Sequence, residues 1–264
     1  MYTFVALFRT FKPSMYTLKK SLGQHFLRDE NMVLKIIAAL RENHFQQLLE
    51  IGPGGGALTK HLINIPGIDF KAVELDDEKI AFLENTYPSL KDKILHSSIL
   101  DIDQPFEGKF TVIGNFPYNI SSQILFKILD WRDDVEVVVG MFQKEVAQRV
   151  AAKHGNKTYG ILSVLIQAFF DVEYLFEVHE NCFNPPPKVK SAVIRLVPRK
   201  TRLDIPDEAK FFRLVKTAFN QRRKMLRNAV KSLFDEQTLA QPVFNKRAEQ
   251  LSIDDFVSLQ HLMN

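Results

Sequence analysis

Short runs of apolar residues alternate with segments of helical spacing through the first three quarters of the chain. The runs are rich in β-branched and aromatic residues and predict strands at Gln47–Gly52, Phe70–Asp76, Lys93–Ile99, Phe110–Asn115 and Val135–Met141. Between them, the spacing predicts helices at Ala57–Asn64, Glu78–Tyr87, Ser121–Asp130 and Lys144–Ala152. Because strands and helices alternate, we expect an α/β fold, a parallel sheet with helices on both faces.

The pattern changes toward the C-terminus. Two more strands are expected at Tyr174–Val178 and Ala192–Val197, on either side of the segment NCFNPPPK. Its three successive prolines cannot donate ladder hydrogen bonds, so this segment is predicted to be a shaped loop. From Asp207 onward only helical spacing remains, with a break near Gln241–Pro242. We therefore predict an α/β domain over 15–199 and a small helical domain over 200–264.

The first 14 residues, MYTFVALFRTFKPS, are apolar and basic. Their apolar stretch is short and no small-residue cleavage site follows, so we favour translation that starts at Met15 over an organelle signal. With either interpretation, this segment is excluded from the predicted fold.

The composition is that of a folded globular protein. Hydrophobic residues make up 45% and charged residues 25%, which excludes disorder and fibrous repeats. No apolar run approaches the roughly 20 residues that span a bilayer. The single cysteine, Cys182, excludes an internal disulfide and fits a reducing compartment, so we expect a cytoplasmic protein. No coiled-coil seam is present, and we expect a monomer.

The first predicted strand runs directly into a glycine-rich turn, GPGGGALT, that begins at Gly52. Glycines permit a close approach of a ligand to the backbone, and a helix N-terminus offers unpaired amides. Glu74 ends the second strand 22 positions beyond Gly52, where an acid can accept hydrogen bonds from ribose hydroxyls. The alternative is a merely solvated acid. Together the two features favour an adenosine-bearing cofactor, either NAD or S-adenosylmethionine.

The fourth strand ends in Asn115-Phe116-Pro117-Tyr118, at the edge of the sheet where ligands bind. The exocyclic amine of adenine is a weak nucleophile because its lone pair is delocalised into the ring. The side-chain oxygen of Asn115 and a backbone carbonyl held by Pro117 would accept its two hydrogens, and Tyr118 offers a stacking ring. A sulfonium methyl donor needs positioning rather than a catalytic triad or a metal, which favours S-adenosylmethionine. The alternative is an ordinary strand-to-helix turn.

Basic residues gather in two stretches that contain no acid. One holds Arg9, Lys12, Lys19, Lys20 and Arg28, and the other, Ala209–Phe234, holds eight basic residues. Helical spacing over Gln221–Phe234 predicts a helix with Lys224, Arg227 and Lys231 on a flanking face. We expect nucleic-acid phosphates to be bound by Arg222, Arg223, Lys224 and Arg227. The alternative is a solvated face.

Six segments, taken in order, resemble the motifs of the KsgA-type small-subunit ribosomal RNA adenine dimethyltransferases. They are SLGQHFL (21–27), LEIGPGGGALT (49–59), VELD (73–76), GNFPYNIS (114–121), QKEVAQR (143–149) and FNPPPKVKSAV (183–193). QRRKMLRN (221–228) is similar to their helical C-terminal domain. The resemblance implies a Rossmann-like domain that uses S-adenosylmethionine to dimethylate two adjacent adenosines near the 3′ end of small-subunit (16S) ribosomal RNA during subunit biogenesis.

The resemblance also implies roles for single residues. His25 and Leu27 resemble the segment that closes over the cofactor, although relatives often have asparagine in place of His25. Gly52 and Glu74 match the loop and ribose positions, and Asn115 matches the position that meets cofactor and target. Tyr118 and Phe183 match the pair that holds the flipped adenine.

One position departs from the pattern of these relatives. They usually carry an acid at the end of the third strand, which meets the adenine amine of the cofactor, and Ser98 stands there in this chain. A serine hydroxyl can accept the same hydrogen bond without charge assistance. Asp101 is the alternative if the loop shifts.

Two other functions stay open. A macrolide-resistance methylase of large-subunit ribosomal RNA shares the fold and the order of motifs, although FNPPPKVKSAV and QRRKMLRN favour the small-subunit group. A ribosome-assembly or transcription factor could keep the fold without catalysis. The intact Gly52, Glu74 and Asn115 argue against such a loss.

Overall fold

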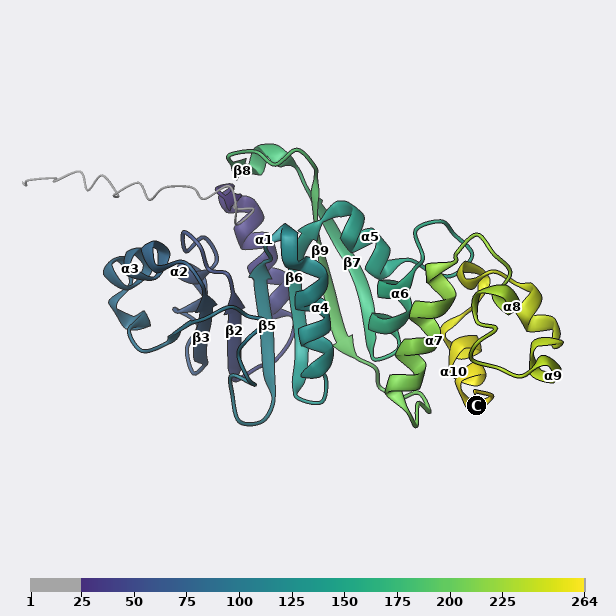
Figure 1. Cartoon of the computed structure of the whole chain (residues 1–264). Helices are drawn as coiled ribbons and strands as arrows, with labels where there is room; N and C mark the ends of the chain where they lie inside the picture. Colours follow the sequence, from purple (N-terminus) through teal and green to yellow (C-terminus); the bar gives the residue numbers. More distant parts are fainter. Residues whose placement is uncertain (1–24, 264) are drawn as a thin grey trace, which may run out of the picture.

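The computed structural model describes residues 25–263 and has a seven-stranded sheet at its centre (Figure 1). The strands are β2 (Gln47–Ile51), β3 (Asp69–Glu74), β4 (Ile94–His96), β5 (Phe110–Asn115), β6 (Val135–Gln143), β7 (Phe170–Val178) and β9 (Ser191–Pro198). Their spatial order is β4-β3-β2-β5-β6-β9-β7. The neighbours from β4 to β6 are parallel, whereas β9 is antiparallel to β6 and to β7. The strand order reverses between β2 and β5, so a ligand crevice is expected at their carboxyl ends.

Helices cover both faces of this sheet, which confirms the predicted α/β fold. One core joins the sheet to α1 (Glu30–Arg41), α2 (Thr59–Leu62) and α3 (Asp77–Thr86). A second core joins its other face to α4 (Ser121–Asp130), α5 (Lys144–Ala151) and α6 (Ile161–Gln167). Within residues 25–263, no helix combines the length and the apolar character needed to cross a bilayer.

The described chain after β9 is helical. It contains α7 (Glu208–Asn220), α8 (Leu226–Ala229), α9 (Glu236–Leu239) and α10 (Ile253–His261), with 3-10 turns at Pro242–Asn245 and Ala248–Gln250. The apolar side chains of these helices belong to the same core as α4, α5 and α6. The boundary near residue 200 therefore stays a prediction, since the two parts of the chain share buried contacts.

The predicted helix over Gln221–Phe234 is wrong. Only Leu226–Ala229 is α-helical, and turns precede and follow it. Leu226, Val230 and Leu233 are nevertheless buried, because short turns bring each of them to the core. The apolar spacing in this segment reflects tertiary packing rather than one continuous helix.

A second, two-stranded sheet joins the start of the described chain to the proline-rich segment. Strand β1 (Phe26–Leu27) pairs antiparallel with β8 (Phe183–Asn184), and the backbone N–H of Arg28 donates to the Cys182 carbonyl at 2.8 Å. This small sheet lies above the carboxyl end of the large one (Figure 1). The predicted extension at 1–14 and the basic residues Arg9, Lys12, Lys19 and Lys20 lie outside the described residues.

Candidate active site

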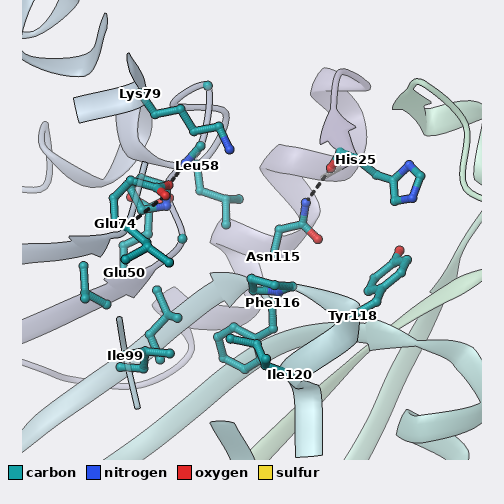
Figure 2. Close-up of a pocket in the computed structure, with 18 of the residues that line it drawn as sticks. His25, Glu50, Leu58, Glu74, Lys79, Ile99, Asn115, Phe116, Tyr118 and Ile120 are labelled. Carbon is teal, nitrogen blue, oxygen red and sulfur yellow. Dashed lines mark hydrogen bonds between the residues drawn. The ribbon is translucent and has the colours of Figure 1, made fainter. Parts of the chain in front are cut away.

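A cavity of about 220 Å³ lies at the carboxyl ends of β2, β3 and β5 (Figure 2). Eight of the predicted site residues line it, namely His25, Leu27, Gly52, Glu74, Ser98, Asn115, Pro117 and Tyr118. The position follows from the strand order, because loops that leave a parallel sheet where that order reverses separate and leave a crevice between them.

The glycine loop forms one wall of the cavity and approaches β1 closely. Gly54 has a φ of +55°, and a Cβ on it would lie 3.1 Å from a ring carbon of Phe26. Its backbone N–H donates to Glu74 Oε2 at 3.2 Å. A residue without a side chain is therefore needed at Gly54 both for the backbone conformation and for the space beneath Phe26.

Glu74 is held by backbone donors on the same wall. Its Oε1 accepts from the N–H of Leu75 at 2.9 Å and from that of Asp76 at 3.1 Å, and only 8% of the residue is exposed. A carboxylate offers about four acceptor sites, so this fixed group can still accept from a ribose hydroxyl. Asp76 caps α3 by accepting from Glu78 N–H, as its position before that helix predicts.

Asn115 projects from the end of β5 with its amide orientation fixed. The side-chain nitrogen donates to the backbone carbonyl of His25 at 3.0 Å. The oxygen of the same amide faces Tyr118 across the cavity (Figure 2). Because one end of the amide is committed to His25, the other end presents an acceptor at a fixed place.

Tyr118 lies opposite Asn115 and is also held in place. Its hydroxyl hydrogen-bonds to the Ser191 hydroxyl, and its ring centroid lies 5.7 Å from that of His25. Burial raises the pKa of the phenol, while the hydrogen bond to Ser191 lowers it. The His25 ring in turn contacts the Pro185 carbonyl through Nδ1 at 2.9 Å. The two rings together form one side of the cavity mouth.

Phe116 and Pro117 set the course of the segment between Asn115 and Tyr118. The Phe116 ring is buried and packs edge-on against Phe142 at 4.9 Å between ring centroids. A Cβ on Gly114 or Gly140 would lie only 2.7 Å or 2.5 Å from this ring, so both glycines make room for it. The buried ring thus anchors the loop that carries Asn115 and Tyr118.

Ser98 lines the cavity at the turn after β4, whereas Asp101 is not among the described residues that line it. The Ser98 hydroxyl accepts from Leu100 N–H at 3.2 Å and stabilises this turn. Of the two candidates for contact with the cofactor adenine, Ser98 is the one that lines the cavity.

The loop predicted for the segment NCFNPPPK is wrong at Phe183. Phe183 forms β8, its side chain is fully buried, and it belongs to the core with Leu27 and Val193. Pairing between β1 and β8 turns this segment into a strand and directs the ring inward. The role in holding a flipped adenine therefore gains no support from the position of Phe183.

Two residues of the cavity were missed in the sequence. Glu50 on β2 is 1% exposed, and Lys79 on α3 is 3% exposed. Each occupies a position of an apolar pattern, Glu50 two residues after Leu48 and Lys79 four residues before Leu83. A charged residue at a position where the spacing of apolar residues predicts a buried side chain was the signal that could have identified them.

Arg222, Arg223 and Lys224, three of the predicted phosphate contacts, lie between α7 and α8, and Arg227 lies in α8. In Figure 1 these elements are on the opposite side of β7 from the cavity strands. Arg223, Lys224 and Arg227 are exposed. Arg222 is half-buried, lies 3.8 Å from a Glu249 carboxylate oxygen and donates to the Asn156 carbonyl at 3.4 Å. Three of the four side chains are thus available to a partner, and Arg222 also ties the turn to neighbouring loops.

A sheet of this strand order, with a glycine loop, an acid held by backbone N–H groups and a fixed asparagine around one cavity, is the fold of a Rossmann-like S-adenosylmethionine-dependent methyltransferase. The family profile described as "Ribosomal RNA adenine dimethylase" matches residues 15–264. The chain belongs to this family of ribosomal RNA adenine dimethylases, as the order of its motifs predicts.

Two relatives illustrate the similarity. Ribosomal RNA small subunit methyltransferase A of Cytophaga hutchinsonii is 51% identical over 251 residues, which cover 93% of this chain and 97% of that protein. The protein of the same name in Flavobacterium johnsoniae is 52% identical over 246 residues, which cover 91% and 94%.

Two solved structures share the fold. A dimethyladenosine transferase from Plasmodium falciparum superposes with a TM-score of 0.75 at 24% identity, covering 90% of this chain and 99% of that one. The 23S rRNA methyltransferase ErmE gives a TM-score of 0.66 at 22% identity, covering 89% and 99%. At such identities the likeness shows the fold alone, and it extends over the sheet and the C-terminal helices.

Proposed function

We propose that this protein transfers methyl groups from S-adenosylmethionine to the exocyclic amine of two adjacent adenosines near the 3′ end of small-subunit ribosomal RNA. One observation carries the proposal, the fixed amide of Asn115 with its oxygen facing the Tyr118 ring across the cavity. Membership of the adenine dimethylase family and the names of its relatives support the choice of RNA and of subunit.

The cavity residues fit the cofactor. S-adenosylmethionine supplies an electrophilic methyl group when it is bound. The missing side chain at Gly54 lets the glycine loop pack against Phe26 at the edge of the cavity, and Glu74 would keep acceptor capacity for the ribose. Ser98 would accept from the adenine amine, while His25, just before β1, and Leu27 in β1 would cover the cofactor. These residues bind and orient, which is the main contribution an enzyme must make to a sulfonium methyl transfer.

The target amine needs two acceptors, and the chain offers two at the end of β5. One is the oxygen of Asn115. The Pro117 carbonyl already accepts from the Ser121 hydroxyl at 3.1 Å and from Ile120 N–H at 3.3 Å. We therefore assign the second role to the carbonyl of Phe116, whose residue is anchored by its buried ring. Tyr118 would stack on the extruded base, an interaction worth ~1–3 kcal/mol.

Structured RNA would be held away from the cavity by the exposed Arg223, Lys224 and Arg227, with Arg222 beside them. Guanidinium and ammonium groups bind phosphates without reading sequence, so this surface would position the RNA while the pocket selects the base. Because its proposed substrate is ribosomal RNA, the protein would act where ribosomes assemble, in the cytoplasm.

Transfer of labelled methyl groups to isolated ribosomal subunits tests the proposal. Purified protein is incubated with labelled S-adenosylmethionine and under-methylated small or large subunits. Label in small-subunit RNA is the expected result. Label only in large-subunit RNA would favour a methylase of the macrolide-resistance type. Binding of the cofactor without transfer to either subunit would favour an assembly factor that has lost catalysis.

A further inference from the structure

One buried acid of the cavity has no part in the transfer described above. Glu50 is 1% exposed and lines the cavity from β2. Its neighbours across the sheet are Ala72 of β3 and Ile113 of β5, both fully buried. By strand alternation its side chain points to the same face as Leu48, toward the core beneath α1 and α2. A carboxylate in such a place is costly unless it is neutralised or balanced by a positive charge.

One hydrogen bond and one nearby charge affect the protonation of this carboxyl. The hydroxyl of Thr59, the first residue of α2, donates to Glu50 Oε2 at 2.8 Å. Glu74 lies on the same side of the cavity (Figure 2). Burial raises the pKa of Glu50 to about 8; the Thr59 hydrogen bond lowers it and the Glu74 charge raises it. At neutral pH the Glu50 carboxyl of the empty cavity is therefore mainly protonated.

The other charged groups around Glu50 leave it without a paired cation. Within residues 25–263, no ion pair to Glu50 is formed. Lys60 of α2 pairs with Glu30 at 2.5 Å, and the Lys79 ammonium of α3 lies 5.3 Å from the centre of the Phe26 ring. Tyr87 follows α3, and its pKa is raised by burial, so this phenol is neutral. Among the described residues, Glu50 therefore has no paired cation that would hold it ionised in the empty cavity.

We infer that Glu50 is neutral in the empty cavity and releases its proton to solvent when S-adenosylmethionine binds, so that its carboxylate balances the positive charge of the cofactor. This inference rests on the proposed function. The cofactor carries a sulfonium, an ammonium and one carboxylate, hence a single net positive charge. A positive charge brought into a water-poor cavity favours the ionised form of a nearby carboxyl.

The same balance distinguishes the cofactor from its product. S-adenosylhomocysteine lacks the sulfonium and carries no net charge. After transfer, Glu50 regains a proton from solvent as the charge that held it ionised disappears. Until that proton returns, the Glu50 carboxylate has no positive charge to balance it, and its burial cost weakens the hold of the cavity on the product. Glu50 thus balances the charge of the bound cofactor and takes no part in the transfer step itself.

Calorimetry of binding tests the inference without any measurement of activity. Titration in buffers of different ionisation enthalpy, near pH 6.8, counts the protons released; the cofactor's own ammonium stays protonated there, because α-amino groups titrate at about 7.7–8.0. The intact protein should release close to one proton per S-adenosylmethionine and markedly fewer per S-adenosylhomocysteine. Glu50→Gln, which keeps an acceptor for Thr59, should lose this release, whereas the exposed Glu173→Gln should match the intact protein.

Two further readouts accompany the proton count. Up to about pH 7, the affinity for S-adenosylmethionine should increase with pH, by as much as about tenfold per pH unit. This is the slope that the release of one proton on binding produces. In Glu50→Gln it should be flat. The infrared band of a protonated carboxyl should disappear when the cofactor binds to the intact protein, and this measurement needs no variant if Glu50→Gln fails to fold.

The outcomes separate the inference from the proposed function. Equal proton release by the intact protein and folded Glu50→Gln, or equal release with the two ligands, would overturn the role of Glu50 and leave the methyltransferase assignment standing. Failure of the folded, intact protein to bind S-adenosylmethionine at all would instead overturn the proposed function.

Discussion

At the scale of single residues, the candidate site depends on side chains whose orientation is fixed by a second contact. Asn115 is fixed by the His25 carbonyl, Tyr118 by the Ser191 hydroxyl and Glu74 by three backbone N–H groups. Fixed acceptors need no reorganisation when the target amine gains positive charge, which is how preorganised polar groups lower a barrier. The chemistry therefore depends on where these few polar atoms are held.

The first prediction concerns Asn115→Ala. Loss of one preorganised acceptor should lower the methyl-transfer rate ~10²–10³-fold. Affinity for S-adenosylmethionine should fall much less, because Glu74 and the glycine loop remain. Single-turnover rates and calorimetric binding constants would be compared with those of the exposed Asn245→Ala, which should behave as the intact protein. A transfer rate unchanged in Asn115→Ala would remove this residue from the mechanism.

A second prediction concerns pH and Glu50. The folded protein keeps the Glu50 proton up to a pKa of about 8, whereas the unfolded chain loses it near the ordinary value of 4.5. The folded state thus binds more protons between these values, and this contribution to stability is present at low pH and lost as pH rises toward 8. Since each pKa unit corresponds to about 1.4 kcal/mol, the effect is on the order of a few kcal/mol.

Urea unfolding of the cofactor-free protein at both ends of this window measures the effect. Glu50→Gln does not titrate, so its free energy of unfolding should increase relative to the intact protein as pH rises. A constant difference between the two proteins would contradict the neutral state assigned to Glu50.

The sequence predicted residues whose role follows from local chemistry and missed those whose role depends on packing. Gly52, Glu74 and Asn115 stand at fixed offsets from strand ends, and all three line the cavity. The burial of Phe183 depends on pairing between β1 and β8, which are separated by more than half the chain and which no local pattern reveals. The burial of Lys79 was missed although its spacing from Leu83 was a local signal, because the charged residues around it in α3 predict an exposed face.

At the scale of elements, Gly54 in the glycine loop can be compared with Gly67 outside it. The comparison separates the effect of a steric clash from the effect of backbone strain. Gly54 and Gly67 both have positive φ, but a Cβ on Gly54 meets Phe26 whereas one on Gly67 meets nothing within 4 Å. Replacing either by alanine should cost about 1 kcal/mol of stability through backbone strain. Only Gly54→Ala should weaken S-adenosylmethionine binding, as measured by calorimetry. Equal binding losses in the two variants would show that strain alone is responsible.

The small β1–β8 sheet provides another prediction at this scale. Phe183→Ala removes a fully buried ring and should cost about 3–5 kcal/mol in the free energy of unfolding. Phe183→Leu should restore most of that loss, because it refills the core. Denaturant titration measures both. Unchanged stability of Phe183→Ala together with weakened binding of RNA would return this ring to the base-holding role implied by resemblance.

Among the elements, the sequence predicted the strands of the large sheet better than the helices. Short apolar runs mark all seven strands, although β7 begins at Phe170 rather than at Tyr174. Helix α1 was not predicted, yet Asp29 caps it and its buried residues Val33, Ile36, Ile37 and Leu40 show the spacing of one helical face. For α1, then, the local signal was present, whereas the turns around α8 are formed by contacts distant in sequence.

At the scale of the whole molecule, alternation of strands and helices predicted a parallel sheet but not its antiparallel member. Strand β9 lies between β6 and β7 and carries the chain from the sheet to the C-terminal helices. Its place depends on long-range pairing, for example of Val139 with Arg195. The resulting arrangement separates the cavity from the exposed basic residues, so the proposed function assigns base selection and RNA retention to different parts of the molecule.

The RNA surface can be tested by charge reversal of Arg223, Lys224 and Arg227 to glutamate. Affinity for small-subunit RNA should fall, and the slope of log affinity against log salt should decrease by about 0.7–0.9 for each phosphate that the variant no longer binds. The control variant reverses exposed lysines elsewhere, Lys91, Lys93 and Lys109, and so has the same net charge. An equal loss of affinity in both variants would mean that net charge alone, and not this surface, retains the RNA.

Nucleoside mass spectrometry of the methylated RNA tests the central claim most directly. Under-methylated small subunits are incubated with S-adenosylmethionine and either the intact protein or Asn115→Ala, and the RNA is then digested to nucleosides. The account predicts adenosine dimethylated on its exocyclic amine with the intact protein and almost none with Asn115→Ala. Methylation on another base or atom, or equal dimethyladenosine from both proteins, would contradict it.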